Sequence, residues 1–246
     1  MWLIVAGFAA VALAHVAPFP FLLEYMGPGR SVWQGPPADG PPRVFLTFDD
    51  GPNPDATPAL LDVLAAEGAT ATFFVIPAHV TAATAPIVRR ALDEGHGVAM
   101  HAGTAALMFK SPPEMAAWVN EHAASVEALV GERPCPLFRP HAGLRGGEMY
   151  AGLGLSGYRL AGWGFSLWDF DWWWARRPNR LAARLARRVS DGSIVVMHDG
   201  HHRNPRADRR RTIETTRRLV RELKTRGFTF GTLCEVVDPV GYPSRS

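Results

Sequence analysis

Residues Val44–Pro54 read VFLTFDDGPNP, an apolar run that ends in two adjacent carboxylates, Asp49 and Asp50. A short apolar run bounded by glycine and proline is typical of a buried strand. Two neighbouring carboxylates at the end of such a strand repel each other, and one stays protonated unless a positive charge lies close by. The stretch therefore predicts a core strand that ends at a cation.

Strand-like and helix-like segments alternate along the rest of the chain. Further strands are expected within residues 69–77, 96–102, 135–140, 158–165, 193–199 and 227–237, with helices over 57–68, 85–95 and 111–131. We expect Thr57 to cap the first of these helices and Gly68 to end it. Alternation of this kind predicts a parallel sheet, either open or closed into a barrel.

Chemistry in such folds gathers where the strands end. The polar residues at these positions are Asp49, Asp50, His101, Arg139, Asp171, His198 and Asp199. We interpret His96 as structural and His79 and His122 as ordinary surface residues. The run WDFDWWW, residues 168–174, suits either a core or stacking on sugar rings.

The bulk composition allows one large α/β domain. The chain has 246 residues, 47% of them hydrophobic, and a formal net charge of +3. Arginines concentrate after residue 175, within 174–189 and 201–227, where apolar residues recur at helical spacing. These segments predict amphipathic helices with solvated basic faces, and the lack of interleaved aromatic residues argues against nucleic-acid binding. Cys135 and Cys234 are either free core thiols or one disulfide.

The N-terminal residues 1–23 contain no Asp, Glu, Lys or Arg. We interpret them as an uncleaved signal-anchor, with a cleaved signal or a buried helix as alternatives. Residues 24–43 are rich in proline and glycine and read as a linker into a domain over 44–240. This organisation predicts a membrane-anchored or exported protein of the cell envelope.

Four stretches together resemble the polysaccharide deacetylase family, the NodB-homology domain of carbohydrate esterase family 4. TFDDGP (47–52) matches the family's first motif, FRPHAG (138–143) matches the third in part, and FDWW (170–173) and VMHDG (196–200) fit the fourth and fifth. The resemblance covers about residues 44–237. It implies a distorted parallel (β/α) barrel and a metal-dependent hydrolase of linear amides, which removes acetyl groups from N-acetylated amino sugars of a chitin-like or peptidoglycan-like polysaccharide.

The resemblance also implies a role for individual residues. Asp49 would be the general base, paired with Arg139, and His198 the general acid, held by Asp171. Asp169 is an alternative partner for His198. Asp50 and His101 would bind one divalent ion, taken to be zinc, with cobalt, nickel or manganese as alternatives. Trp172, Val196 and Pro140 would line the substrate pocket.

One position departs from the family pattern. The second motif is His-(Ser/Thr)-x-x-His, whereas residues 101–108 read HAGTAALM, with Ala105 in place of the second histidine. Alanine has no donor atom, so one direct metal ligand is missing. Three explanations remain open: waters complete the site; His141, His201 or His202 fills the gap; or the chain is a non-catalytic glycan-binding relative.

Overall fold

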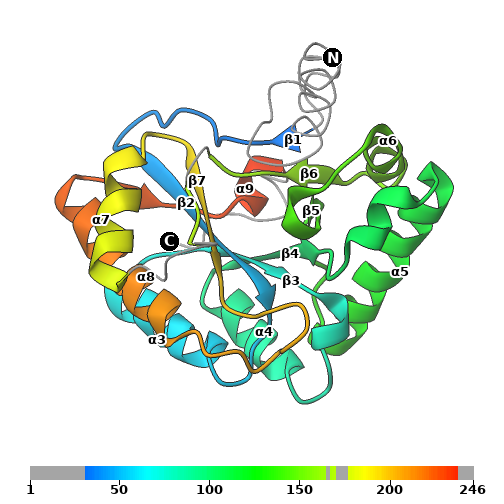
Figure 1. Cartoon of the computed structure of the whole chain (residues 1–246), viewed down its shortest axis with the longest axis horizontal. Helices are drawn as coiled ribbons and strands as arrows, with labels where there is room; N and C mark the ends of the chain where they lie inside the picture. The colour runs from blue at the N-terminus through cyan, green and yellow to red at the C-terminus, as the bar shows by residue number, and fades with distance from the viewer. Residues whose placement is uncertain (1–30, 165–166, 170–176, 238–246) are drawn as a thin grey trace, which may run out of the picture.

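The computed structural model describes residues 31–164, 167–169 and 177–237, which form a parallel β-sheet flanked by helices (Figure 1). The strands run in the order β1-β6-β5-β4-β3-β2-β7, with β8 pairing β2, and all these pairings are parallel. Their bounds are β1 Ser31–Val32, β2 Arg43–Gly51, β3 Thr72–Val75, β4 Gly97–His101, β5 Leu137–Arg139, β6 Arg159–Ala161, β7 Ser193–His198 and β8 Thr229–Phe230.

Helices connect successive strands from β2 onward and cover the outside of the sheet, except for α9, which follows the last strand and packs against the inner cluster. They are α3 Thr57–Glu67, α4 Ala85–Asp93, α5 Pro112–Val130, α6 Gly147–Leu155, α7 Pro178–Arg188, α8 Arg210–Thr225 and α9 Cys234–Val237. Short 3₁₀ turns, η1 Pro77–His79, η2 Ala105–Phe109 and η3 His141–Gly143, follow β3, β4 and β5. Figure 1 shows α3 to α8 arranged around the outside of the curved sheet, with α7, α8 and α3 on the left of the view and α5 and α6 on the right. The predicted alternating α/β fold with a parallel sheet is confirmed.

The two ends of the strand order come together. After β6, the Gly164 amide donates to Ile194 O at 3.0 Å, the Asp169 amide donates to Val196 O at 3.1 Å, and the Val196 amide donates to Leu167 O at 2.8 Å. These bonds join the segment after β6 to β7, at the opposite end of the strand order, so the sheet curves toward a barrel. The curvature gives the sheet an inner and an outer face.

Strand β2 divides its side chains between these two faces. Val44, Leu46 and Phe48 pack in the core between sheet and helices, whereas Phe45 packs in a second, inner cluster with side chains such as Phe74 and Val196. Because side chains alternate along a strand, Thr47 and Asp49 continue the inner face of Phe45. The strand therefore carries its first carboxylate to the inner end of the sheet.

Cys135 and Cys234 form a disulfide, with Cα atoms 5.6 Å apart, and this decides between the two alternatives left open by the sequence. The bridge ties the segment before β5 to α9, across 99 residues of sequence. It lies in the inner cluster, where Leu137 and Leu233 are also fully buried.

The N-cap predicted for the first helix is wrong. Helix α3 begins at Thr57 itself, with Ala56 at the N-cap position and no side-chain cap. The Thr57 hydroxyl instead accepts a hydrogen bond from the Asn53 amide and donates one to the carboxylate of Asp199. The Thr57 hydroxyl is thus bonded to the distant Asp199 carboxylate instead of capping the helix.

Part of the predicted linker is ordered into the sheet, because β1 pairs with β6 and Gly35 donates to Gly192 O at 2.8 Å. The predicted signal-anchor, residues 1–23, lies outside the described residues. Among the residues that the structure does describe, no helix combines the length and apolarity needed to cross a bilayer.

Candidate active site

The strand register brings four of the predicted site residues to one end of the sheet. Asp49 on β2 is paired with His198 on β7, and His101 on β4 is paired with Arg139 on β5. Each of these residues lies at or next to the carboxyl end of its strand, where parallel α/β folds place their chemistry. The grouping expected from the sequence is therefore present in the structure.

Arg139 is fully buried and holds Asp49. Its Nη1 donates to Asp49 Oδ1 and to Thr47 Oγ1, both at 2.7 Å, and its Nη2 donates to Gly162 O at 2.9 Å. Its guanidinium also lies 3.9 Å from the ring centroid of Phe74. Burial lowers the pKa of Arg139, and the charge of Asp49 opposes that shift. The pair leaves neither buried charge without a counter-charge, which answers half of the problem posed by the adjacent carboxylates.

Asp50 leaves the regular strand path. The register of β2 against β3 shifts between Asp49 and Gly51, and Asp50 has a φ of 72°, in the left-handed region that Asp tolerates better than most residues. An irregularity of this kind re-aims a side chain, so two consecutive carboxylates both reach the site. His79 Nδ1 donates to the backbone carbonyl of Asp50 at 3.1 Å. The prediction that His79 is an ordinary surface residue is thus wrong.

His101 faces Asp50 in the orientation of a metal ligand. Its Nδ1 lies 2.9 Å from Arg139 O, and because a carbonyl only accepts, Nδ1 is the donor. Its Nε2 then points at Asp50 Oδ1, 3.2 Å away. Burial would raise the pKa of Asp50, but contact with His101 and the charges of His101, His198 and His202 bring it well below its usual range.

His198 pairs with Asp169. Its Nδ1 donates to Asp169 Oδ1 at 2.6 Å, and its backbone amide donates to Asp169 Oδ2 at 2.9 Å. Burial would lower the pKa of His198, but the charge and hydrogen bond of Asp169, with the charges of Asp49 and Asp50, raise it to about 9. The side chain is 21% exposed, so it is within reach of a substrate. Asp169, the alternative partner of His198 in the sequence, thus contacts it, whereas Asp171, the first choice, lies outside the described residues.

Three imidazoles form a second group near Asp50, here called the histidine cluster: His141, His201 and His202. The ring centroids of His141 and His202 are 4.7 Å apart, and those of His201 and His202 are 4.5 Å apart. Burial lowers the pKa of His141, His101 and His202 add to that shift, and Asp50 opposes it. The cluster lies on the turns that follow β5 and β7, the strands that carry Arg139 and His198.

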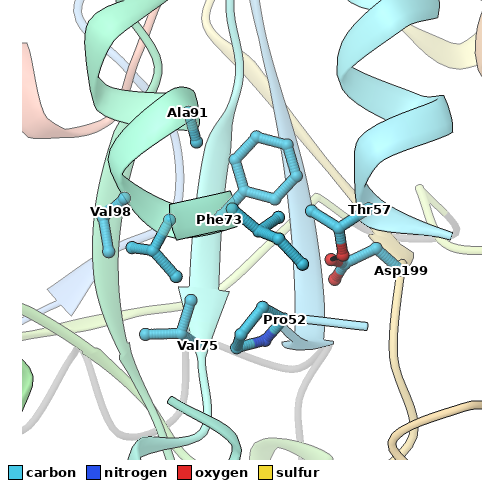
Figure 2. Close-up of a pocket in the computed structure, with 9 residues that line it drawn as sticks. Pro52, Thr57, Phe73, Val75, Ala91, Val98 and Asp199 are labelled. Carbon is cyan, nitrogen blue, oxygen red and sulfur yellow. Dashed lines mark hydrogen bonds between the residues drawn. The ribbon is translucent and has the colours of Figure 1, made fainter. Parts of the chain in front are cut away.

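Asp199 lies behind the site rather than in it. Its carboxylate is 1% exposed and accepts from Thr57, and burial raises its pKa to about 7. A Cβ built on Gly51 would lie 2.4 Å from Asp199 Oδ2, so only glycine fits there. Figure 2 shows Asp199 and Thr57 at the edge of a small pocket whose other lining side chains, such as Phe73, Val75 and Val98, are apolar. We interpret this pocket as space in the core, because apolar side chains offer a sugar no hydrogen bonds.

Two of the three predicted substrate-binding residues can be placed. Pro140 is buried and leads into η3, and Val196 is 1% exposed on β7, between Leu167 and Asp169 of the segment that closes the sheet. Trp172 lies outside the described residues. The contact of these residues with substrate stays a prediction.

Comparison with known proteins defines the family. Residues 37–161 match the family model described as polysaccharide deacetylase, and the chain belongs to this family. It is 31% identical to a chitooligosaccharide deacetylase of Bradyrhizobium sp., over 77% of this chain and 88% of the relative. It is 29% identical to a peptidoglycan-N-acetylglucosamine deacetylase of Bacillus cereus, over 85% of this chain and 93% of the relative. A family 4 acetyl xylan esterase from Clostridium thermocellum, solved in complex with a cobalt ion, aligns with a TM-score of 0.69 at 28% identity, over 82% of this chain and 93% of the esterase.

The residues present suit a divalent cation in part. Asp50 Oδ1 is buried without a hydrogen-bond partner among the described residues, and it faces His101 Nε2. In the neutral imidazole this nitrogen carries no proton, because the proton is on Nδ1, which donates to Arg139 O. Carboxylate oxygen and imidazole nitrogen are both zinc ligands. Within the described residues, no three His, Cys, Asp or Glu side chains already converge at metal-binding distance. The site thus offers two candidate ligands, and Ala105, the first residue of η2, offers none.

Proposed function

We propose that this protein is a metal-dependent hydrolase that removes acetyl groups from the N-acetylated amino sugars of a polysaccharide. The substrate would be a chitin-like oligomer or a peptidoglycan-like glycan, since curated relatives carry the names chitooligosaccharide deacetylase and peptidoglycan-N-acetylglucosamine deacetylase. The observation that carries the proposal is the strand register that sets Asp49, held by Arg139, beside His198, held by Asp169.

Each of the two residues suits one proton transfer in amide hydrolysis. Asp49 accepts a proton from the attacking water, and Arg139, itself anchored on Thr47, holds the base in place. His198 protonates the leaving amine, which departs poorly as an anion, and Asp169 keeps the proton on the imidazole near neutral pH. Such a reaction needs a base and an acid that each have their own counter-charge, and the pairs Asp49–Arg139 and His198–Asp169 meet this need.

Asp50 and His101 would hold the divalent ion. When bound, zinc or a similar cation would polarise the acetyl carbonyl and lower the pKa of a bound water from about 15.7 to near 7. Its charge would also neutralise Asp50, the second of the adjacent carboxylates. His79 supports the same ligand from behind, because it fixes the backbone carbonyl of Asp50.

We further propose that the protein works outside the cytoplasm, at the cell envelope, with the apolar residues 1–23 as its membrane anchor. The disulfide between Cys135 and Cys234 supports this location, because structural disulfides persist mainly in oxidising compartments. A polysaccharide substrate of the envelope would be reached there. Fractionation of cells followed by protease treatment of intact spheroplasts tests the location: protection of the chain from added protease would contradict it.

The experiment that tests the activity is acetate release from an N-acetylglucosamine oligomer. We expect release by the full chain with added zinc, loss with excess chelator, and recovery when zinc is restored. The Asp49→Asn variant keeps a side chain of similar shape without the basic carboxylate, so it should lose at least about 100-fold in rate. Release that persists in chelator would contradict metal dependence.

A non-catalytic glycan-binding protein is the second candidate, favoured by Ala105 and by the absence of a ready three-ligand set in the described residues. It predicts binding of the oligomer without acetate release under any metal. Equilibrium dialysis of the oligomer, run beside the acetate assay, separates the two functions.

A further inference from the structure

We propose that His202 supplies the metal ligand that Ala105 lacks, so that the cation is held by Asp50, His101 and His202. The inference rests on the proposed function, because it concerns the same cation. Ala105 begins η2 with only a methyl group to offer, and the replacement donor therefore has to come from another loop at the end of the sheet. The loop that follows β7 carries His202.

This loop is fastened to the loop that carries Asp50. The Asn53 side chain donates to Ala207 O at 2.9 Å, and Arg206 forms an ion pair with Asp55 at 2.5 Å. Gly200 packs directly on the Asp50 carbonyl, since a Cβ built on Gly200 would lie 2.0 Å from that oxygen. The close approach brings the turn at His202 to Asp50, although the two residues are far apart in the sequence.

The turn itself is defined by the backbone. The Asn204 amide donates to His201 O at 3.1 Å, which makes His202 a central residue of a tight turn. On the far side, the His202 ring meets His141, which follows β5 and its Arg139. The loop that carries His202 thus contacts the Asp50 loop on one side and, through the His202 ring, the turn after β5 on the other.

The ring nitrogens distinguish His202 from its neighbour His201. His201 Nδ1 already accepts a hydrogen bond from the Arg203 amide at 3.1 Å. The His202 imidazole makes ring contacts but no hydrogen bond with the described residues, so both of its nitrogens can serve a metal. His202 is also half-buried rather than fully buried, so its ring has room to change rotamer toward the ion. That change is required, because three ligands do not yet converge in the described residues.

The resulting donor set has a chemical preference. One carboxylate oxygen and two imidazole nitrogens suit zinc or cobalt, and three protein ligands leave a fourth position for water. The set has the same composition as the one carboxylate and two histidines that the family's motifs would provide. Only the position of the second histidine in the chain differs, on the loop after β7 instead of η2.

The test is metal affinity, measured on the full chain stripped with chelator. Zn²⁺ is titrated calorimetrically, and Co²⁺ is followed by its visible absorption, which reports coordination without any substrate. Variants are His202→Ala, the matched control His201→Ala, His141→Ala, and the double variant His202→Ala with Ala105→His. Near-ultraviolet circular dichroism checks that each variant is folded.

We expect one ion per chain, with at least tenfold weaker affinity in His202→Ala and less than twofold change in His201→Ala and His141→Ala. Ala105→His should restore the affinity of His202→Ala, because it returns the ligand to its position in the family motif. An unchanged affinity in His202→Ala, or a loss confined to His141→Ala, would overturn the inference. Metal binding as expected without acetate release would instead refute the proposed activity and leave the ligand assignment standing.

Discussion

Replacing Arg139 by methionine tests whether the buried guanidinium is what makes the Asp49 carboxylate tolerable in the core. Arg139 is 0% exposed, and it bonds Asp49 and Thr47 at 2.7 Å and Gly162 O at 2.9 Å. Removing one partner of a buried ion pair costs about 3–5 kcal/mol. The carbonyl of Gly162 also loses its donor, which adds about 1 kcal/mol. Arg139→Met should therefore lower the free energy of unfolding by about 5 kcal/mol, a large part of the stability of a typical domain.

A double-mutant cycle with Asp49→Asn separates the charge interaction between Arg139 and Asp49 from the other contacts of Arg139. This second change removes the carboxylate charge that Arg139→Met leaves uncompensated. We expect the double variant to be more stable than the sum of the single changes predicts, by about 2 kcal/mol or more, since close charged partners couple by about 0.5–3 kcal/mol. Free energies of unfolding come from urea titrations followed by tryptophan fluorescence, with chelator present so that no metal contributes.

Additivity of the two changes to within about 0.5 kcal/mol would refute this reasoning, because independent sites add to that accuracy. If Arg139→Met alone does not fold, the double variant should recover a folded population. Failure of the double variant to do so would equally contradict a charge-based role for Arg139.

Three further perturbations test other parts of the molecule. Asp169→Asn should move the alkaline limb of the kcat pH profile to lower pH. Asp169 is the main group that raises the pKa of His198 from 6.5 to about 9, and the protonated acid is lost as pH rises through that value. An unmoved limb in a folded variant would contradict the pairing of Asp169 with His198. Burial lowers the pKa of His96 from 6.5 to about 4. Between pH 6.5 and about 4, His96 is therefore protonated in the unfolded chain but not in the folded one. The free energy of unfolding should fall by up to about 3 kcal/mol as pH drops through this range. His96→Asn should flatten this dependence in urea titrations at several pH values, and a slope equal to wild type would contradict it. Replacing Cys135 and Cys234 together by serine should cost about 2–5 kcal/mol of unfolding free energy, given the 99-residue separation; a loss below about 1 kcal/mol would show that the unfolded chain is not constrained by the bridge.

The strand that carries the first motif could be predicted well from sequence. An apolar run that ends in Asp49 and Asp50 predicts a buried strand whose end lies next to a positive charge. The alternation of strand and helix predicts that this end meets the ends of the neighbouring strands. His101, Arg139 and His198 then fall at the same edge because parallel strands share their direction. These residues are grouped in the structure as expected, and their chemical roles stay proposals.

The contacts that depend on loops could not be predicted in the same way. His79 reaches the backbone of Asp50 through η1, and Asp199 captures the hydroxyl of Thr57, and neither contact leaves a periodic signal in the sequence. The partner of His198 shows the same limit. Asp169 and Asp171 are two residues apart, and only the backbone of the closing segment decides that Asp169 accepts from both the ring and the amide of His198.

The position of a bound metal decides whether Asp50 and His101 share one ion. Crystals of the full chain grown with zinc, measured on both sides of the zinc absorption edge, show the ion by its anomalous signal. We expect one strong peak at about 2.0–2.2 Å from both Asp50 Oδ1 and His101 Nε2. A fully occupied zinc elsewhere, with these two side chains still in direct contact with each other, would contradict it.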